Sequence, residues 1–206
     1  MKRLFLASSF NGVARLFSSF VNEDLKGKTV TFIPTASVPE KLSFYVNSGR
    51  KALLKLGLIV DELEVSTATA DEISSKLQQN DFIYITGGNT FFLLQELKRT
   101  GADSIIIEQI NSGKVYIGES AGAIIMSPNI EYAKDMDSCK KAPDLNTFSA
   151  LKVVEFYPLP HYTNQPFKKA VEKIIAAYES KLQLYPISNS QAILVNGEDV
   201  RVESKK

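Results

Sequence analysis

The chain has 206 residues, which is long enough for one sizeable hydrophobic core and short for two. Hydrophobic residues make up 44% of it and charged residues 23%, an ordinary balance for a globular protein. The formal net charge is +1, from 24 basic and 23 acidic residues, so the composition favours neither nucleic acid nor an anionic membrane as a partner. We expect a single domain over residues 1–206.

Cysteine and histidine each occur once, as Cys139 and His161. One cysteine forms no internal disulfide, and together with one histidine it cannot complete a structural zinc site. The apolar stretch at the N-terminus is too short for a signal peptide, and no segment approaches the roughly 18 apolar residues of a membrane span. These features predict a cytoplasmic protein, and nothing in them indicates an oligomeric state.

In chain order, short apolar runs alternate with longer amphipathic segments. Strands are expected near residues 3–7, 29–34, 58–63, 82–85 and 115–117, and helices near 12–22, 40–56, 71–78, 90–98 and 102–111. This alternation is typical of an α/β fold with a mostly parallel sheet and helices on both of its faces.

The second half of the chain has a different pattern. Residues 128–150 are polar and include two prolines, which indicates a long loop of the kind that often carries function. A strand is expected near 153–156, and the clearest apolar periodicity of the chain predicts a helix over 166–179 with Asn164 as its cap. Strands near 184–187, 192–196 and 200–202 complete the chain, and an Asn196-Gly197 turn joins the last two into a hairpin.

Residues 118–122 read Gly-Glu-Ser-Ala-Gly, a match to the G-x-S-x-G nucleophile elbow. In such an elbow a strand turns so sharply into a helix that the serine hydroxyl projects from the sheet edge, and the glycines prevent collisions. A strand candidate ends just before this segment, and small residues begin a helix after it. We therefore expect Ser120 to be a nucleophile. The alternative is a passive serine in a tight strand–helix turn.

A serine nucleophile needs a base to accept its proton, and His161 is the one histidine available. His161 follows a predicted strand and precedes a helix, so its loop and the Ser120 turn are expected at the carboxyl ends of the strands, where sites form. A histidine near prolines is more often a surface or capping residue. Beside the elbow, we favour the role of a base.

Attack on a carbonyl group creates an oxyanion that needs preorganised N–H donors. The N–H of Ala121, directly after Ser120, is one candidate. The Thr-Gly-Gly-Asn-Thr segment at 86–90 is a source of the second donor, because glycines let the backbone approach a substrate closely. The alternative is a glycine turn in which Asn89 or Thr90 caps the next helix, and the two interpretations are compatible.

Residues 87–90 (Gly-Gly-Asn-Thr), 118–122 and 160–164 (Pro-His-Tyr-Thr-Asn) together resemble the peptidase E (aspartyl dipeptidase) and cyanophycinase-like serine peptidases. The resemblance spans most of the chain, and its length suits peptidase E better. It implies a class I glutamine-amidotransferase-like (flavodoxin-like) fold, a catalytic Ser120–His161 pair, and no metal or cofactor. It also implies oxyanion donors at Gly88 and Ala121, and a small peptide as substrate. The positions assigned to substrate binding are Gly87, Asn89, Thr90 and Glu119.

The group that orients His161 has two candidate positions. Asp135 lies where the family has an Asn-Asp-Met segment. The other position, before the last hairpin, usually carries an acid followed by glycine in the family, whereas this chain has Asn189 and Ser190. In serine proteases an Asp→Asn change at this role costs about 10⁴ in turnover. Both candidates stay open, since Asp135 is otherwise a solvated loop acid and Asn189 a turn residue.

Peptidase E enzymes cleave dipeptides that begin with aspartate, and such selection needs a positive group, preferably arginine. The helix after His161 offers only Lys168 and Lys169. We therefore predict a serine peptidase that hydrolyses small peptides through a Ser120 acyl-enzyme, without assigning Asp-X specificity.

Two alternatives belong to other classes. An esterase or amidase of the α/β-hydrolase type would place its acid between the serine and the histidine, where Asp135, Asp137 and Asp144 lie. A family member that has lost hydrolysis and binds a small ligand or a partner is the second alternative, and Asn189 in place of an acid motivates it.

Overall fold

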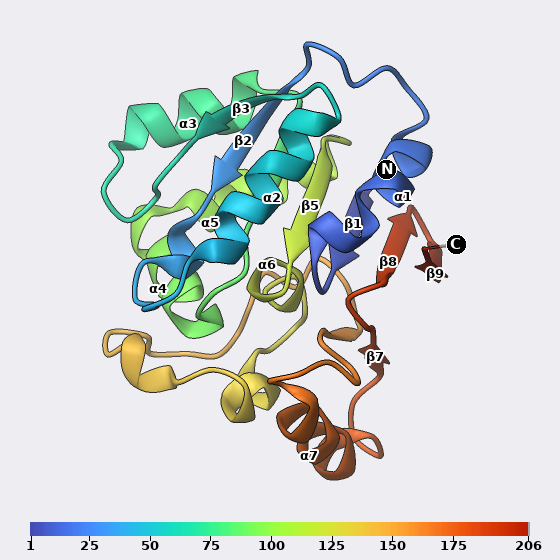
Figure 1. The fold of residues 1–206 in the computed structure, drawn as a ribbon. Helices are drawn as coiled ribbons and strands as arrows, with labels where there is room; N and C mark the ends of the chain where they lie inside the picture. The colour runs from blue at the N-terminus through green and yellow to red at the C-terminus, as the bar shows by residue number, and fades with distance from the viewer. Residues whose placement is uncertain (206) are drawn as a thin grey trace.

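The computed structural model describes residues 1–205, and its main feature is a seven-stranded sheet in the order β3-β2-β4-β5-β1-β8-β9 (Figure 1). The strands from the first part of the chain are mutually parallel: β1 (Arg3–Ala7), β2 (Thr29–Ile33), β3 (Ile59–Glu62), β4 (Phe82–Ile85) and β5 (Val115–Glu119). β8 (Gln191–Asn196) runs antiparallel to β1, and β9 (Asp199–Ser204) forms a hairpin with β8. The prediction of a mostly parallel sheet with a C-terminal hairpin is confirmed.

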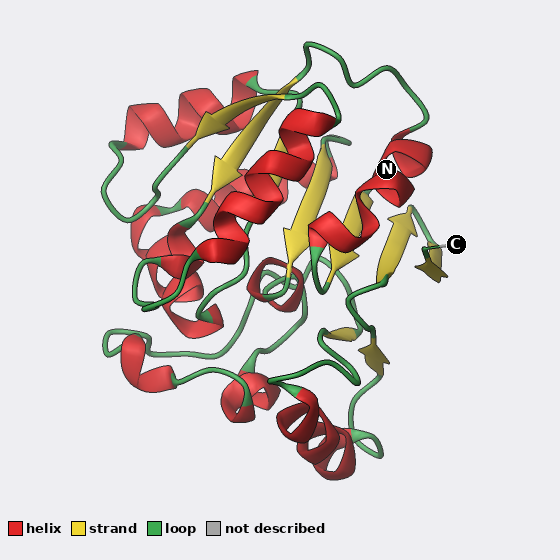
Figure 2. Ribbon diagram, viewed as in Figure 1, coloured by secondary structure: helices red, strands yellow, loops and turns green. Residues whose placement is uncertain are grey.

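Helices cover both faces of the sheet (Figure 2). They are α1 (Phe10–Val21), α2 (Phe44–Lys55), α3 (Ala70–Gln79), α4 (Thr90–Thr100) and α5 (Ala102–Asn111). α1 and α2 pack over one apolar cluster, and α3, α4 and α5 contribute to a second cluster on the other face. α1 buries Phe10, Val13, Phe17 and Val21, the spacing of a helix with one apolar face. None of the helices within residues 1–205 combines the length and the apolar character that crossing a membrane requires.

Between β5 and β8 the chain forms a group of elements that lie beyond the arrowhead of β5 (Figure 1). They are α6 (Ala121–Ile124), the 3₁₀ turns η2 (Glu131–Asp135) and η3 (Cys139–Lys141), the parallel pair β6 (Tyr157–Leu159) and β7 (Leu184–Pro186), and α7 (Lys168–Tyr178). A further 3₁₀ turn, η1 (Thr35–Ser37), follows β2.

Two local predictions in this region are wrong. Residues 153–156 form no strand, because the N–H groups of Val153 and Val154 both donate to the carbonyl of Met126 and hold this buried segment against α6; the strand begins at Tyr157. Asn164 does not cap α7, which is preceded by Phe167 without a side-chain cap.

The register of the strands brings distant segments to one edge of the sheet, the one at which the carboxyl ends of the parallel strands lie. Ala7 at the end of β1 pairs with Glu119 at the end of β5 and with Ala192 near the start of β8. Because β8 is antiparallel to β1, the residues that precede β8 lie at the same edge as those that follow β1 and β5. This edge therefore collects side chains from the beginning, the middle and the end of the chain.

The aromatic cluster under α1 predicts the first measurable effect. Phe17 is fully buried and packs edge-to-face on Phe5, with ring centroids 5.4 Å apart. Phe17→Ala removes this contact and leaves a cavity, so we expect it to lower the free energy of unfolding by roughly 3–5 kcal/mol. Phe44→Ala, at a side chain that is 73% exposed, should change it by less than about 0.5 kcal/mol. Urea unfolding followed by circular dichroism measures both, and equal losses would contradict the packing described.

Candidate active site

Ser120 sits in a strained turn between β5 and α6. Its backbone has φ 51° and ψ −106°, outside the regions that non-glycine residues ordinarily adopt. Glycines make the turn possible: a Cβ on Gly118 would lie 2.5 Å from the carbonyl oxygen of Gly122, and one on Gly122 would lie 2.4 Å from that of Ile85. The N–H of Ser120 donates to the carbonyl of Ala7 at 2.9 Å, which fixes the turn to β1.

His161 meets this serine from the loop that follows β6. The Oγ of Ser120 and the Nε2 of His161 are 2.8 Å apart, a hydrogen-bond distance. The backbone N–H of His161 donates to the Oγ of Ser8 at 3.0 Å, and the Ser8 hydroxyl donates to the carbonyl of Ile187 at 2.8 Å. The imidazole stacks on the ring of Phe167, with centroids 4.7 Å apart. Backbone and ring are therefore both held.

Asn189 contacts the other nitrogen of the imidazole. Its Oδ1 lies 3.0 Å from the Nδ1 of His161, and its backbone N–H donates to the Oδ1 of Asn164 at 2.8 Å. A carboxamide oxygen only accepts hydrogen bonds, so Nδ1 carries the proton in this arrangement and Nε2 presents a lone pair to Ser120. This is the tautomer that a base acting on the serine hydroxyl requires.

Asp135 lies away from the imidazole. Its carboxylate forms an ion pair with Lys173 on α7, and within residues 1–205 the side chain of His161 forms its hydrogen bonds with Ser120 and Asn189. Of the two positions considered for the orienting group, the structure thus brings Asn189 and not Asp135 to His161. The nearby acid Asp137 also has another partner, Thr90 on α4.

The glycine loop after β4 runs beside the serine. A Cβ on Gly87 would lie 3.1 Å from the Cβ of Ser120, and Gly88, at φ 138°, passes so close to η1 that a Cβ would lie 2.2 Å from the carbonyl oxygen of Ala36. Asn89 caps α4, its Oδ1 accepting from the N–H of Phe92 at 3.0 Å. The predicted cap at Asn89 is therefore confirmed, and the two glycines let this loop pass close to η1 and to Ser120.

The N–H groups of Gly88 and Ala121, the predicted oxyanion donors, donate no hydrogen bond to any group within residues 1–205. Ala121 begins α6, and the first N–H groups of a helix lack intrahelical acceptors. Two unused donors thus belong to segments that adjoin the serine.

Two positions assigned to substrate binding have protein partners. The Oε2 of Glu119 accepts from the hydroxyl of Tyr84 at 2.6 Å and its Oε1 from the N–H of Phe10 at 2.9 Å, so Glu119 ties β5 to β4 and to the start of α1. Burial raises the pKa of Glu119, and these two hydrogen bonds oppose the shift. Thr90 donates its N–H and its hydroxyl to Asp137 and is fully buried.

A cavity of about 550 Å³ opens over the serine and the histidine. The predicted positions Gly87, Gly88, Asn89, Glu119, Ser120, His161 and Asn189 line it, whereas Thr90, Ala121 and Asp135 do not. Its remaining wall is mixed. Apolar side chains come from the loop before α2, from the start of α2 and from the residues that precede α7, and charged side chains come from the loop before α2 and from the long loop after α6. The size suits a short peptide or another small molecule.

Burial lowers the pKa of the His161 imidazole below its ordinary value of 6.5, and the hydrogen bond with Asn189 opposes this shift in part. The ring is therefore neutral at physiological pH. A neutral imidazole with its lone pair on a serine hydroxyl can accept the proton of that hydroxyl.

Several contributors were not identified from the sequence. Ser8 holds the His161 backbone, Asn164 holds that of Asn189, and Phe167 stacks on the imidazole. Ser8 had a detectable signal, because it directly follows the first strand and so lies at the functional sheet edge. The sequence pattern predicts Asn164 as a helix cap, and no signal in the sequence distinguishes Phe167 from the other apolar residues near this helix.

Comparison with known proteins identifies the family of the chain. The family model "Peptidase family S51" matches residues 4–203. An uncharacterized peptidase of Listeria monocytogenes is 59% identical over 200 residues, 97% of each chain, and peptidase E of Haemophilus influenzae is 33% identical over 139 residues, 68% of this chain and 60% of that protein. The crystal structure of a Listeria monocytogenes protein assigned to peptidase E superposes with a TM-score of 0.96 at 57% identity, covering 100% of both chains. A peptidase from an acI-B1 actinobacterium, at 22% identity, shares the fold, with a TM-score of 0.75 over 100% of this chain and 88% of that one.

The fold, the serine elbow and these relatives define a serine-type peptidase. The chain belongs to peptidase family S51, and the predicted resemblance to peptidase E is confirmed.

His161 is the only histidine, so its imidazole can be followed by NMR without overlap. We expect the pKa of the wild-type ring to lie below 6.5 because the ring is buried. Asn189→Asp places a carboxylate at Nδ1 and should raise this pKa, since an adjacent negative charge favours the imidazolium. Asp135→Asn should leave it unchanged, and an effect of Asp135→Asn equal to that of Asn189→Asp would contradict the assignment of Asn189 as the contact.

Proposed function

We propose that this protein hydrolyses small peptides, with Ser120 as the nucleophile and His161 as the general base. The observation that carries the proposal is the 2.8 Å contact between the Oγ of Ser120 and the Nε2 of His161, at a strained elbow that lines the cavity. Nucleophile and base at hydrogen-bond distance, with the base oriented by a third group, are the geometric signature of covalent catalysis by serine.

The reaction takes place in two halves. The Oγ of Ser120 attacks the scissile carbonyl carbon while His161 accepts the hydroxyl proton at Nε2, and the N–H groups of Gly88 and Ala121 are the assigned donors to the resulting oxyanion. The C–N bond then breaks, the leaving amine takes the proton from His161, and an acyl-enzyme remains. In the second half, water gives a proton to His161 while its oxygen attacks the ester carbon. The bond from that carbon to the Oγ of Ser120 then breaks, His161 returns the proton to Oγ, and the acid product leaves.

Asn189 acts in this proposal by orienting His161. Its Oδ1 accepts the Nδ1 proton and so selects the reactive tautomer, but a neutral carboxamide adds no charge to stabilise the imidazolium. Asn189 is itself held by Asn164 and by the close approach of α1, where a Cβ on Gly12 would lie 2.2 Å from the Asn189 carbonyl oxygen. These contacts support a positioning role for Asn189.

Covalent labelling tests the nucleophile. A fluorophosphonate probe should form one adduct, on Ser120, and labelling should disappear in Ser120→Ala and slow by at least about 100-fold in His161→Ala, since general-base assistance contributes about 10²–10⁴. Mass spectrometry of the intact protein and of its peptides measures the adduct. Ser127→Ala, at a buried serine hydrogen-bonded to the carbonyl of Asn129, is the matched control. A folded wild-type protein that remains unlabelled would disprove the proposal.

Substitution of Asn189 tests the orienting group. Asn189→Ala removes the acceptor at Nδ1, and we expect the labelling rate to fall by about 10-fold or more, because the imidazole loses its fixed tautomer. Asn189→Asp retains the acceptor and should label at least as fast as wild type at neutral pH. In wild type and in Asn189→Asp, the labelling rate should fall as the pH drops through the pKa of His161, because only the neutral ring accepts a proton. Unchanged labelling in Asn189→Ala would exclude the positioning role.

A further inference from the structure

The charges that line the cavity indicate which peptides it accepts. Its acidic residues are Glu40, Glu119 and Asp137, and its one lysine or arginine is Lys141. Lys141 is already paired with Glu40, at 2.7 Å between Nζ and Oε1. Within residues 1–205 the cavity therefore presents no unpaired cation to a substrate carboxylate.

Asp137 has a carboxylate oxygen to spare. Both hydrogen bonds from Thr90, one from its N–H at 2.9 Å and one from its hydroxyl, go to Oδ2, and within residues 1–205 no group donates to Oδ1. The side chain lines the same cavity as Ser120. A carboxylate held in place with one open oxygen is a suitable partner for a cation or for an N–H donor.

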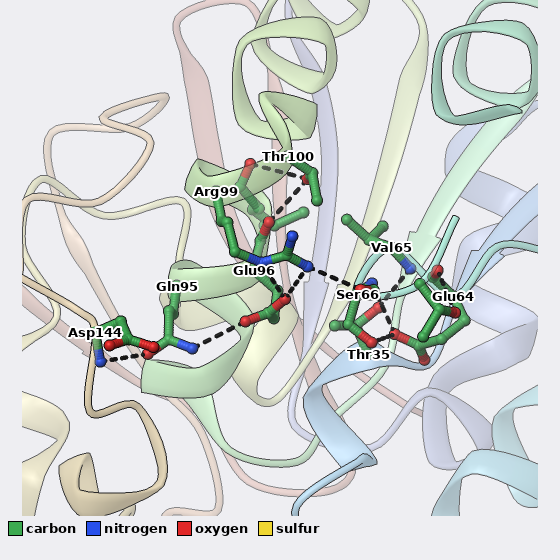
Figure 3. Close-up of polar contacts among 11 residues, drawn as sticks. Thr35, Glu64, Val65, Ser66, Gln95, Glu96, Arg99, Thr100 and Asp144 are labelled. Atoms are coloured by element: carbon green, nitrogen blue, oxygen red, sulfur yellow. Dashed lines mark hydrogen bonds and ion pairs between the residues drawn. The ribbon is translucent and has the colours of Figure 1, made fainter. Parts of the chain in front are cut away.

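The loop that carries Asp137 is fixed to α4 at three places. Besides Thr90, the Nδ2 of Asn89 donates to the carbonyl of Ser138 at 3.1 Å, and the N–H of Asp144 donates to the Oε1 of Gln95 at 2.9 Å. Figure 3 shows the last contact and its continuation, in which Gln95 reaches Glu96 and Glu96 binds Arg99. Asp137 is therefore preorganised and does not depend on a ligand for its position.

Tyr45 supplies a second, independent sign of a ligand. Its hydroxyl oxygen is buried and is the one buried side-chain polar atom within residues 1–205 without a hydrogen-bond partner. Tyr45 lines the cavity one helical turn before Gly49, where a Cβ would meet the hydroxyl of Tyr84 and the carboxylate of Glu119. An unpartnered buried hydroxyl is costly, so its presence beside a substrate cavity points to a ligand group that completes it.

We propose that Asp137 and Tyr45 form a subsite for the free α-ammonium group of a short peptide, and that the cavity selects a neutral, apolar first residue over an acidic one. This inference rests on the proposed peptidase function. Leu42, Phe44, Met136 and Phe167 provide the apolar part of the wall for that first side chain. The subsite departs from the aspartate preference that the resemblance implied, since an aspartate side chain would meet carboxylates and no unpaired cation.

Binding to Ser120→Ala protein tests the subsite without turnover. Isothermal titration would compare leucyl-alanine, N-acetyl-leucyl-alanine and aspartyl-alanine, and we expect leucyl-alanine to bind at least about tenfold more tightly than either of the others. Adding Asp137→Asn should weaken the binding of leucyl-alanine by about tenfold or more and leave the binding of the acetylated peptide unchanged. The asparagine keeps a hydrogen-bond acceptor for Thr90. Adding Tyr45→Phe, which keeps the ring, should weaken leucyl-alanine by a smaller factor.

Asp135→Asn is the matched control, because this acid lies in the same loop but outside the cavity. Any one of four results would overturn the subsite. They are equal binding of the free and acetylated peptides, tighter binding of aspartyl-alanine than of leucyl-alanine, an effect of Asp135→Asn equal to that of Asp137→Asn, and no binding of leucyl-alanine at millimolar concentration. Probe labelling of Ser120 is independent of these results. Normal labelling with any of these outcomes rejects the subsite alone, whereas absent labelling rejects the peptidase mechanism.

Discussion

The tight turn at Ser120 is the constraint on which the rest of the site depends. A non-glycine residue at φ 51° persists only where its surroundings over-determine it. Here the surroundings are the N–H bond to Ala7 and the glycines that let α6 approach β4 and β5 within distances that any side chain would block. The parallel sheet holds the backbone of Ser120 in this strained conformation, and the conformation places the serine hydroxyl in the cavity.

The end of β1 connects this turn to the histidine. Ala7 accepts from the N–H of Ser120, and the next residue, Ser8, accepts from that of His161 while donating to Ile187 beside β7. Ser120 follows a strand of the large sheet and His161 a strand of the small one, yet two adjacent residues, Ala7 at the end of β1 and Ser8 directly after it, fix both of them. The separation of Ser120 and His161 is therefore set by backbone geometry, so the two side chains are preorganised before any substrate binds.

The sequence predicted the parallel sheet, its helices and the serine–histidine pair, because hydrophobic periodicity and the elbow are local signals. The sequence did not decide whether Asp135 or Asn189 contacts His161, since the sequence of a loop does not show whether its acid faces an imidazole or a lysine such as Lys173. The strand predicted at 153–156 failed for a related reason. An apolar run indicates burial, and only the tertiary contact with Met126 shows that its N–H groups bond outside a sheet.

The neutral side chain of Asn189 beside His161 is consistent with the electrostatics of the cavity. A carboxylate in place of Asn189 would stabilise the imidazolium, but it would add a fourth acid to a cavity that holds Glu40, Glu119 and Asp137 against a single lysine. Burial raises the pKa of Glu119, and it raises that of Asp137 to about 6, so negative charge is already costly in this cavity. An amide oxygen at Nδ1 fixes the His161 tautomer without adding a further negative charge to the cavity.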